Sequence, residues 1–221
     1  MDAPIEHDPS AEKQWWLRTL AVFQAPRPVF AALRDDSNEQ AGARQEPVLA
    51  LVLLAGMAGI LLTGATGRLL DEELVDGSLA VVAVLVFLTG GIYGTATYWL
   101  GGAALYVGLR GAGSRGSYRR ARHLLAYAAA PLVLSLLLVW PFRLAVHGSD
   151  SFRSGGDDQG LGRAVLDGVS GAFVAWALGL LVYGIGVVER WSVLRAAVAI
   201  ALVVLGLLLL SLLFVIPLSA G

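Results

Sequence analysis

The stretch from Arg110 to Pro141 reads RGAGSRGSYRRARHLLAYAAAPLVLSLLLVWP, and the rest of the chain is organised around it. It begins with a glycine-rich loop that carries five arginines, namely Arg110, Arg115, Arg119, Arg120 and Arg122. An apolar run from Leu124 to Val139 follows directly. Arginines beside an apolar segment that is long enough to cross a bilayer mark the side that stays in the cytoplasm. The stretch therefore predicts a membrane-spanning helix preceded by a cytoplasmic loop.

The composition is that of a polytopic membrane protein. The chain has 221 residues, of which 57% are hydrophobic and only 15% are charged, whereas about a quarter of the residues of a typical soluble domain are charged. The formal net charge of -1 argues against a nucleic-acid-binding protein, which would need a basic surface. The chain has no cysteine, which excludes disulfides, thiol catalysis and cysteine metal sites.

Residues 1–46 differ from the rest of the chain because they are polar and carry short amphipathic patterns. Trp16, Leu20 and Phe23 recur at helical spacing, which suits a helix in the plane of the membrane interface. The alternative is a helix packed on the bundle or on a partner. A second short helix should follow Pro28, and the polar segment from Asp35 to Gln45 is predicted to be a loop. We expect a cytoplasmic N-terminal region.

Residues 47–221 are predicted to form an all-α transmembrane domain of five helices. The second apolar run is too long for one upright crossing and too short for two, so one long tilted or protruding helix is expected. The third span should kink at Pro131, because proline has no amide hydrogen. The polar segment from Arg143 to Arg163 is predicted to be a loop. The expected spans are about 47–67, 79–109, 122–142, 164–188 and 192–216.

The distribution of basic residues predicts the threading. With five spans, twelve of the sixteen Lys and Arg residues fall on one side, in the N-terminal region, the arginine loop and the turn before the fifth span. Because this excess stays in the cytoplasm, we expect a multi-pass inner-membrane protein with a cytoplasmic N-terminus and an extracytoplasmic C-terminus.

The second and third spans carry small and mildly polar residues in rows. Helices in lipid associate through close packing and hydrogen bonds, so these rows should face neighbouring helices, with Gly90 and Gly94 as a small-residue contact. The alternative is a solute path lined by hydroxyl groups. The residues assigned to packing or to this path are Thr89, Gly90, Tyr93, Gly94, Thr97, Tyr127 and Pro131.

Two short motifs resemble enzyme signatures, but neither has the context that its chemistry needs. Gly111 to Gly116 matches GxGxxG, yet it joins two membrane helices and no acidic residue lies twenty positions on. Ser170 lies in a GxSG pattern, but no histidine follows His147 to act as its base. No ionisable residue lies at mid-depth in any expected span, and the histidines lack metal-ligand spacing. We therefore predict no enzyme activity, no cofactor and no metal site.

The layout resembles the bacterial branch of the Yip family of Ypt/Rab-interacting membrane proteins. The similarity rests on Pro28-Val29-Phe30 before the first span, on Gly116-Ser117-Tyr118, on Ala126-Tyr127 with Pro131, and on the five-helix count, and it covers roughly residues 26–216. The resemblance implies membrane trafficking or shaping without catalysis for eukaryotic members. Their Asp-Leu-Tyr-Gly-Pro signature is missing here, and that departure weakens any implication of Rab-type GTPase binding.

The leading hypothesis is therefore a non-enzymatic membrane-organising or partner-docking scaffold. Its docking surface for protein or lipid would be the arginine loop, at Arg115, Arg119, Arg120 and Arg122, although the same arginines could serve only as a topological anchor. The alternative is a small permeation unit for an uncharged solute or lipid. The candidate partners are membrane lipids, a protein at the cytoplasmic loop and a second copy of the chain, with no nucleic acid.

Overall fold

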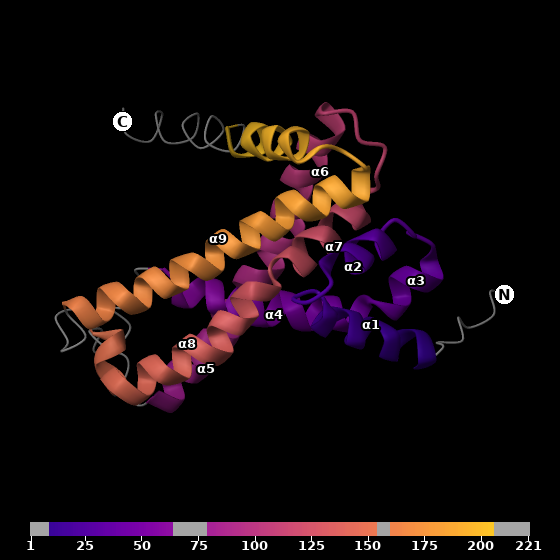
Figure 1. Ribbon diagram of the computed structural model, residues 1–221. Helices are drawn as coiled ribbons and strands as arrows, with labels where there is room; N and C mark the ends of the chain where they lie inside the picture. The colour runs from indigo at the N-terminus through magenta and orange to yellow at the C-terminus, as the bar shows by residue number, and fades with distance from the viewer. Residues whose placement is uncertain (1–8, 64–78, 154–159, 206–221) are drawn as a thin grey trace, which may run out of the picture.

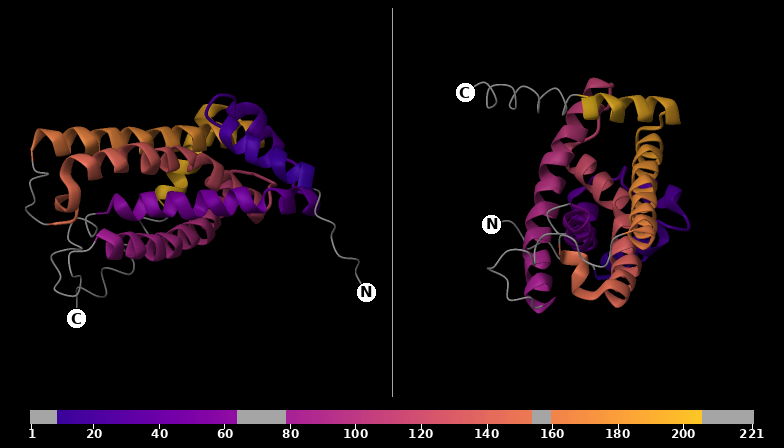
Figure 2. Two further views of the ribbon diagram at one scale, coloured as in Figure 1. Left: turned by 90° about the horizontal axis from the view of Figure 1, so that it is seen from below. Right: turned by 90° about the vertical axis from the view of Figure 1, so that its left-hand side faces the viewer.

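The computed structural model describes residues 9–63, 79–153 and 160–205 (Figure 1). These residues are helical throughout their regular structure, and no strand occurs among them. The all-α prediction is therefore confirmed for the described chain. Three N-terminal helices lie at one end of a group of long helices, as Figure 1 and the left view of Figure 2 show.

The N-terminal layer, as we call residues 9–43, consists of α1 (Pro9–Ala21), α2 (Pro26–Ala32) and α3 (Asn38–Ala43). Proline is well tolerated in the first turn of α2, because amide groups in the first turn of a helix have no intrahelical acceptor and the missing hydrogen therefore costs no hydrogen bond. The prediction of a loop from Asp35 to Gln45 holds for residues 35–37 but was wrong for residues 38–43, which form α3, and for Gln45, where α4 begins. Ser37 caps α3 by accepting a hydrogen bond from the Gln40 amide at 3.3 Å, and Ala41 is buried.

The bundle is built from α4 (Gln45–Leu61), α5 (Leu79–Ala96), α8 (Ala130–His147) and α9 (Leu161–Glu189). Helix α4 packs against both α5 and α8, and α8 packs against α9 (Figure 1). Both α2 and α7 (Tyr118–Ala128) also pack against α9. The main core gathers residues from the N-terminal layer and the bundle, including Phe30, Leu124, Tyr127 and Ile185, so the layer is part of the fold rather than an appendage.

One long helical run connects the far end of α5 to the arginine loop. It continues through the π-helical turn η2 (Thr97–Gly101) into α6 (Gly102–Gly111), so the helix extends unbroken from Leu79 to Gly111. At Pro131 the third apolar segment is interrupted as predicted: α7 ends at Ala128 and α8 begins at Ala130. The pyrrolidine ring removes a helical donor there.

The prediction that residues 143–163 form a loop was wrong over its first part. Helix α8 continues to His147 and is followed by the 3-10 turn η3 (Gly148–Phe152). The continuation carries the apolar residues Leu144, Ala145 and Val146, which keep this part of α8 apolar and are exposed. Arg143 consequently lies inside the helix with 8% of its surface exposed. Residues 154–159 of the predicted loop lie outside the described residues.

The described chain contains three helical runs that are long and apolar enough to cross a membrane: Leu79–Gly111, Tyr118–Phe152 and Leu161–Glu189. Two shorter apolar helices, Gln45–Leu61 and Val193–Leu205, occupy the positions of the first and fifth expected spans. The parts of those spans at 64–67 and 206–216 lie outside the described residues. Helix 193–205 follows a turn at Arg190, which has φ +57°, and packs on α6, where Val203 lies beside Gly108.

Candidate functional site

A buried ionic cluster joins the N-terminal layer to the bundle. Arg44, which precedes α4, has a fully buried side chain, and its Nη2 lies 2.8 Å from Asp36 Oδ1. Arg119 of α7 places its Nε 3.0 Å from the same oxygen. One carboxylate from the segment between α2 and α3 is thus shared by two guanidinium groups from different parts of the chain. We call Asp36, Arg44, Arg119 and His123 the Arg44 cluster.

Further hydrogen bonds complete the surroundings of Arg44. Its Nε donates to His123 Nδ1 at 2.6 Å, and its Nη1 donates to the Asp35 carbonyl at 2.8 Å. The guanidinium carbon also lies 5.4 Å from the ring of Trp15 in α1. A buried arginine is tolerated only when its donors are satisfied. Here the acceptors come from the N-terminal layer and α7, so the cluster requires the two parts to be docked.

Ser117 has two roles at the beginning of α7. Its hydroxyl caps the helix by accepting from the Arg120 amide at 3.0 Å, and it also donates to Asp36 Oδ2. The Gly116-Ser117-Tyr118 motif that carries the sequence resemblance therefore begins the helix and contacts the N-terminal layer at the same place.

The cluster shifts the pKa values of Asp36 and Arg44. Burial alone would raise the pKa of Asp36, but hydrogen bonds from Ser117 and Arg119, together with the charges of Arg119 and Arg44, lower it below its usual value. Burial lowers the pKa of Arg44, against the attraction of Asp36. The carboxylate is thus held in its charged form.

The four arginines of the predicted docking surface have different environments. Arg119 is engaged by Asp36 and also donates to Asn38 Oδ1 at 3.0 Å. Arg120 donates to the carbonyl of Arg34 at 2.8 Å. Arg122 is surrounded by aromatic rings: its guanidinium carbon lies 3.7 Å from the Trp99 ring centroid, 4.6 Å from that of Tyr118 and 5.0 Å from that of Tyr98. Only Arg115 of the four is exposed.

The predicted packing stripe of α5 and η2 is divided between two environments. Gly90 and Gly94 are buried against α4, where a Cβ on Gly90 would lie 2.7 Å from Met57 Cα and one on Gly94 would lie 3.1 Å from Gly56 Cα. Thr89 is exposed, and its hydroxyl donates to the Leu85 carbonyl at 2.5 Å. The other predicted residues of the stripe, Tyr93 and Thr97, line a cavity.

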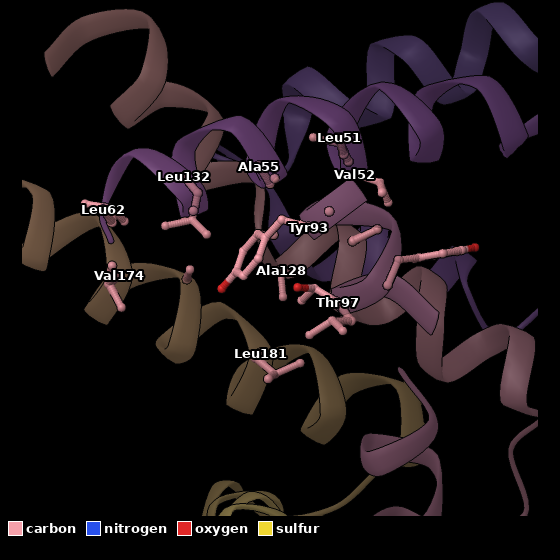
Figure 3. A pocket seen from close by; sticks show the side chains of 18 of the residues that line it. Leu51, Val52, Ala55, Leu62, Tyr93, Thr97, Ala128, Leu132, Val174 and Leu181 are labelled. Carbon is pink, nitrogen blue, oxygen red and sulfur yellow. The ribbon is translucent and has the colours of Figure 1, made fainter. Parts of the chain in front are cut away.

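This apolar cavity has a volume of about 430 Å³ and lies between α4, α5, η2, α7, α8 and α9. Figure 3 shows the Tyr93 ring extending into it, with Leu132 and Val174 on one side and Thr97 on the other. The ring also rests on Gly59 of α4, where a Cβ would lie 2.5 Å from Tyr93 Cε1. The cavity walls are mainly aliphatic, so the hydroxyl groups of Tyr93, Thr97 and Tyr98 are rare polar points on them.

Tyr127 and Pro131 are not on the wall of this cavity, although their neighbours Ala126, Ala128 and Leu132 are. Tyr127 is fully buried against α1, with its ring centroid 5.9 Å from that of Trp15 and its hydroxyl 3.5 Å from Thr19 Oγ1. Pro131 is buried in the first turn of α8. A solute path that included Tyr127 would have to displace α1.

The two enzyme-like motifs lack partners in the described residues. Gly111–Gly116 forms the turn between α6 and α7, with Gly113 at φ +93°. Ser170 is buried in α9, while the His147 ring lies near Gly162, eight residues and therefore about 12 Å away along that helix. No group of three or more His, Cys, Asp or Glu side chains within the described ranges is arranged to hold a metal ion.

Sequence reasoning missed the centre of the Arg44 cluster. Asp36 and Arg44 belong to the segment predicted to be a loop, and His123 was expected at the interface but has only 3% of its surface exposed. The available signal was an acidic pair and an arginine within one polar segment, followed by basic residues at the start of the third span. Their pairing depends on how α2, α3 and α7 dock.

Comparisons with known proteins identify the family. Neither a curated protein nor a solved structure matches the chain. The family model described as the Yip1 domain matches residues 20–215, which include most of the N-terminal layer and the whole described bundle. With its apolar membrane-crossing helices, this chain belongs to the Yip1-domain family of membrane proteins.

Proposed function

We propose that this protein is a non-enzymatic membrane-organising scaffold whose N-terminal layer lies in the cytoplasmic interface of the inner membrane. The observation that carries the proposal is the outer face of α1. Trp16, Leu17 and Leu20 expose 40%, 59% and 68% of their surface, whereas Trp15 of the same helix is buried. An exposed face of this kind, next to basic residues, suits the boundary between head groups and acyl chains.

The attachment of the layer to the bundle supports this function. The Arg44 cluster holds the N-terminal layer against α7, and Phe30 of α2 packs under Gly184 of α9. A helix that inserts into one leaflet and is rigidly fixed to a spanning bundle would act on the lipid packing of that leaflet. The concentration of basic residues on this side supports placing the layer in the cytoplasm and the C-terminus outside.

Partner docking at the arginine loop would depend chiefly on Arg115. Arg119, Arg120 and Arg122 are engaged inside the protein, whereas Arg115 is exposed and has no hydrogen bond or ion pair with the described residues. The Arg115→Gln variant should therefore lose any protein or lipid partner of this loop while keeping the fold. Crosslinking in native membranes, compared with the wild-type protein, measures that loss.

The interfacial seating of α1 can be tested with a single label, since the chain has no cysteine. An environment-sensitive dye on Leu20→Cys should emit as in an apolar medium and be quenched by lipids that carry shallow spin labels. The matched control is Glu39→Cys on the exposed face of α3, which should remain in water. Equal, water-like emission from both positions in vesicles would contradict the seating.

The organising activity needs its own measurement. Wild-type protein reconstituted at rising protein-to-lipid ratio should deform large vesicles, as seen by cryo-electron microscopy. The double variant Leu17→Glu and Leu20→Glu should remain folded, because both side chains are exposed, and should lose the effect. Vesicles that keep their shape with wild-type protein would overturn the proposal.

A second candidate function is permeation of an uncharged solute, which is favoured by the position of Tyr93 and Thr97 on the cavity wall. In that case Tyr93→Phe and Thr97→Val should change solute flux in proteoliposomes, whereas Thr89→Val, outside the cavity, should not. An absence of flux through the wild-type protein would end this reading.

A further inference from the structure

The apolar cavity opens sideways, between two helices that are long enough to cross a membrane. Its inner wall contains buried residues such as Val52 of α4 and Leu181 of α9. Tyr93 of α5 and Leu178 of α9 also line it, but they expose 42% and 53% of their surface. The cavity is therefore closed on the side of α4, and its mouth lies between α5 and α9.

The mouth is far from the ends of these helices. Tyr93 lies fourteen residues, about 21 Å, from Leu79, where the first long run begins. Val174, which also lines the cavity, lies thirteen residues, about 20 Å, from Leu161 at the beginning of α9. A hydrocarbon core is about 30 Å thick. A ligand of this cavity would therefore enter from the lipid and not from water.

Two hydroxyl groups on the cavity wall are unused. Neither Tyr93 nor Thr97 makes a hydrogen bond with any residue that the structure describes. Thr89 shows the usual arrangement, because its hydroxyl, outside the cavity on the same helical run, donates to the Leu85 carbonyl at 2.5 Å. Hydrocarbon contains no water that could satisfy such groups, so an unused donor there is costly. The two hydroxyl groups are thus available to an acceptor on a ligand.

The backbone is irregular at the same place. Thr97 begins the π-helical turn η2, and both Thr97 and Tyr98 of this turn line the cavity. Single π-helical turns within α-helices are rare and occur frequently at functional sites. An irregular turn, an enclosed space and two unused donors on one wall are separate observations that all point to a bound molecule.

The chemistry of the wall selects the class of ligand. Its residues are mainly aliphatic and none of them is charged, so the wall offers nothing to a charged head group. The acyl chain of a phospholipid would fill the space, but its ester oxygens stay at the interface and cannot reach hydroxyl groups at mid-depth. An isoprenoid quinone is uncharged, dissolves in hydrocarbon and carries carbonyl oxygens on a flat ring. A volume of about 430 Å³ is typical of small-molecule sites.

We propose that the apolar cavity is a binding site for an isoprenoid quinone. The quinone carbonyl oxygens accept hydrogen bonds from Tyr93 and Thr97, and the quinone ring packs beside the Tyr93 ring, which extends into the cavity (Figure 3). The prenyl tail leaves between α5 and α9 into the lipid. The site rests neither on the scaffold function nor on permeation, since a quinone held there neither deforms the membrane nor crosses it.

Photoaffinity labelling of the full chain in phosphatidylcholine nanodiscs tests the site. A short-chain ubiquinone that carries an azido group on its ring should label peptides of α5 or α9 in a saturable way. Decylubiquinone should compete for the site. Decylbenzene, which has the same tail on a ring without oxygen atoms, should not compete. Equal competition by the two compounds would overturn the proposal in favour of a cavity for any hydrocarbon chain, and so would labelling that does not saturate.

Conservative variants test the two hydrogen bonds. Tyr93→Phe and Thr97→Val keep the shape of the side chains, and each should weaken competition by decylubiquinone about fivefold, the effect of one neutral hydrogen bond. Thr89→Val is the matched control, because its hydroxyl lies outside the cavity, and it should change nothing. Ala177→Phe should fill the cavity and abolish the labelling. Unchanged affinity in both Tyr93→Phe and Thr97→Val, or an equal loss in Thr89→Val, would overturn the proposal.

Discussion

Arg119 donates a hydrogen bond from its Nε to Asp36 Oδ1 at 3.0 Å, across 83 positions of the chain. Asp36 belongs to the N-terminal layer and Arg119 to the first turn of α7, so the contact joins the two halves of the protein. Arg44, whose side chain is fully buried, binds the same carboxylate oxygen. The organisation of this end of the molecule therefore depends on one acidic side chain.

Replacing that side chain should undock the N-terminal layer. Asp36→Asn leaves the buried Arg44 without a negative partner, and breaking a buried pair in this way typically costs about 3 kcal/mol. We expect a lower thermal unfolding midpoint in detergent and faster proteolysis in the segment between α1 and α4. Asp35→Asn is the matched control, because the exposed Asp35 carboxylate accepts locally from Ser37, whereas Asp36 forms the ion pair with the buried Arg44. Similar losses from both variants would contradict the role of Asp36.

The same carboxylate predicts a pH dependence. The pKa of Asp36 is lowered in the folded protein from its ordinary value of 3.8, so the folded state favours the charged form. The resulting stability is fully present above 3.8 and is lost as the pH falls through the lower folded value. Wild-type protein should thus lose its advantage over Asp36→Asn when the unfolding midpoint is followed below pH 3.8. A constant difference down to the lowest pH measured would show that the charge of Asp36 does not contribute.

The contact between α4 and α5 should be sensitive to single methyl groups. A Cβ on Gly94 would lie 3.1 Å from Gly56 Cα and 3.2 Å from the Val52 carbonyl carbon, both backbone atoms. Gly94→Ala should therefore destabilise the protein by about 1–3 kcal/mol. Gly91→Ala is the control, as its nearest neighbour would be a Leu53 methyl group at 3.5 Å. Unfolding midpoints in detergent should fall for Gly94→Ala only; a Gly91→Ala variant that loses as much would refute this packing.

Comparing Arg122 with Arg115 distinguishes the stabilising effect of ring contacts from that of positive charge alone, because both arginines belong to the arginine loop but only Arg122 lies against aromatic rings. Arg122→Gln removes a guanidinium from the rings of Tyr98, Trp99 and Tyr118 and should cost about 1–2 kcal/mol. Arg115→Gln removes the same charge from an exposed position and should leave thermal stability unchanged. If both variants lose the same stability, the loop contributes through its net charge and the ring contacts are incidental.

The sequence by itself determined the membrane class, the helical architecture, the interruption at Pro131 and the family. These properties are local: they follow from the hydropathy of single segments, from the missing amide of one proline and from short motifs. The helical pattern of α1 was also readable, but it could not say that Trp15 is buried and Trp16 exposed, since that depends on what α1 packs against.

Only the tertiary structure decided which charges meet. The arginine loop was read as one surface. In the structure, Arg119 and Arg120 contact the segment between α2 and α3, whereas Arg122 contacts aromatic rings of η2 and α7. Arg143 was assigned to a loop, and the structure places it in α8 beside Asp167. Pairings between residues tens of positions apart arise from how helices dock, and side-chain periodicity along one helix carries no information about its partner.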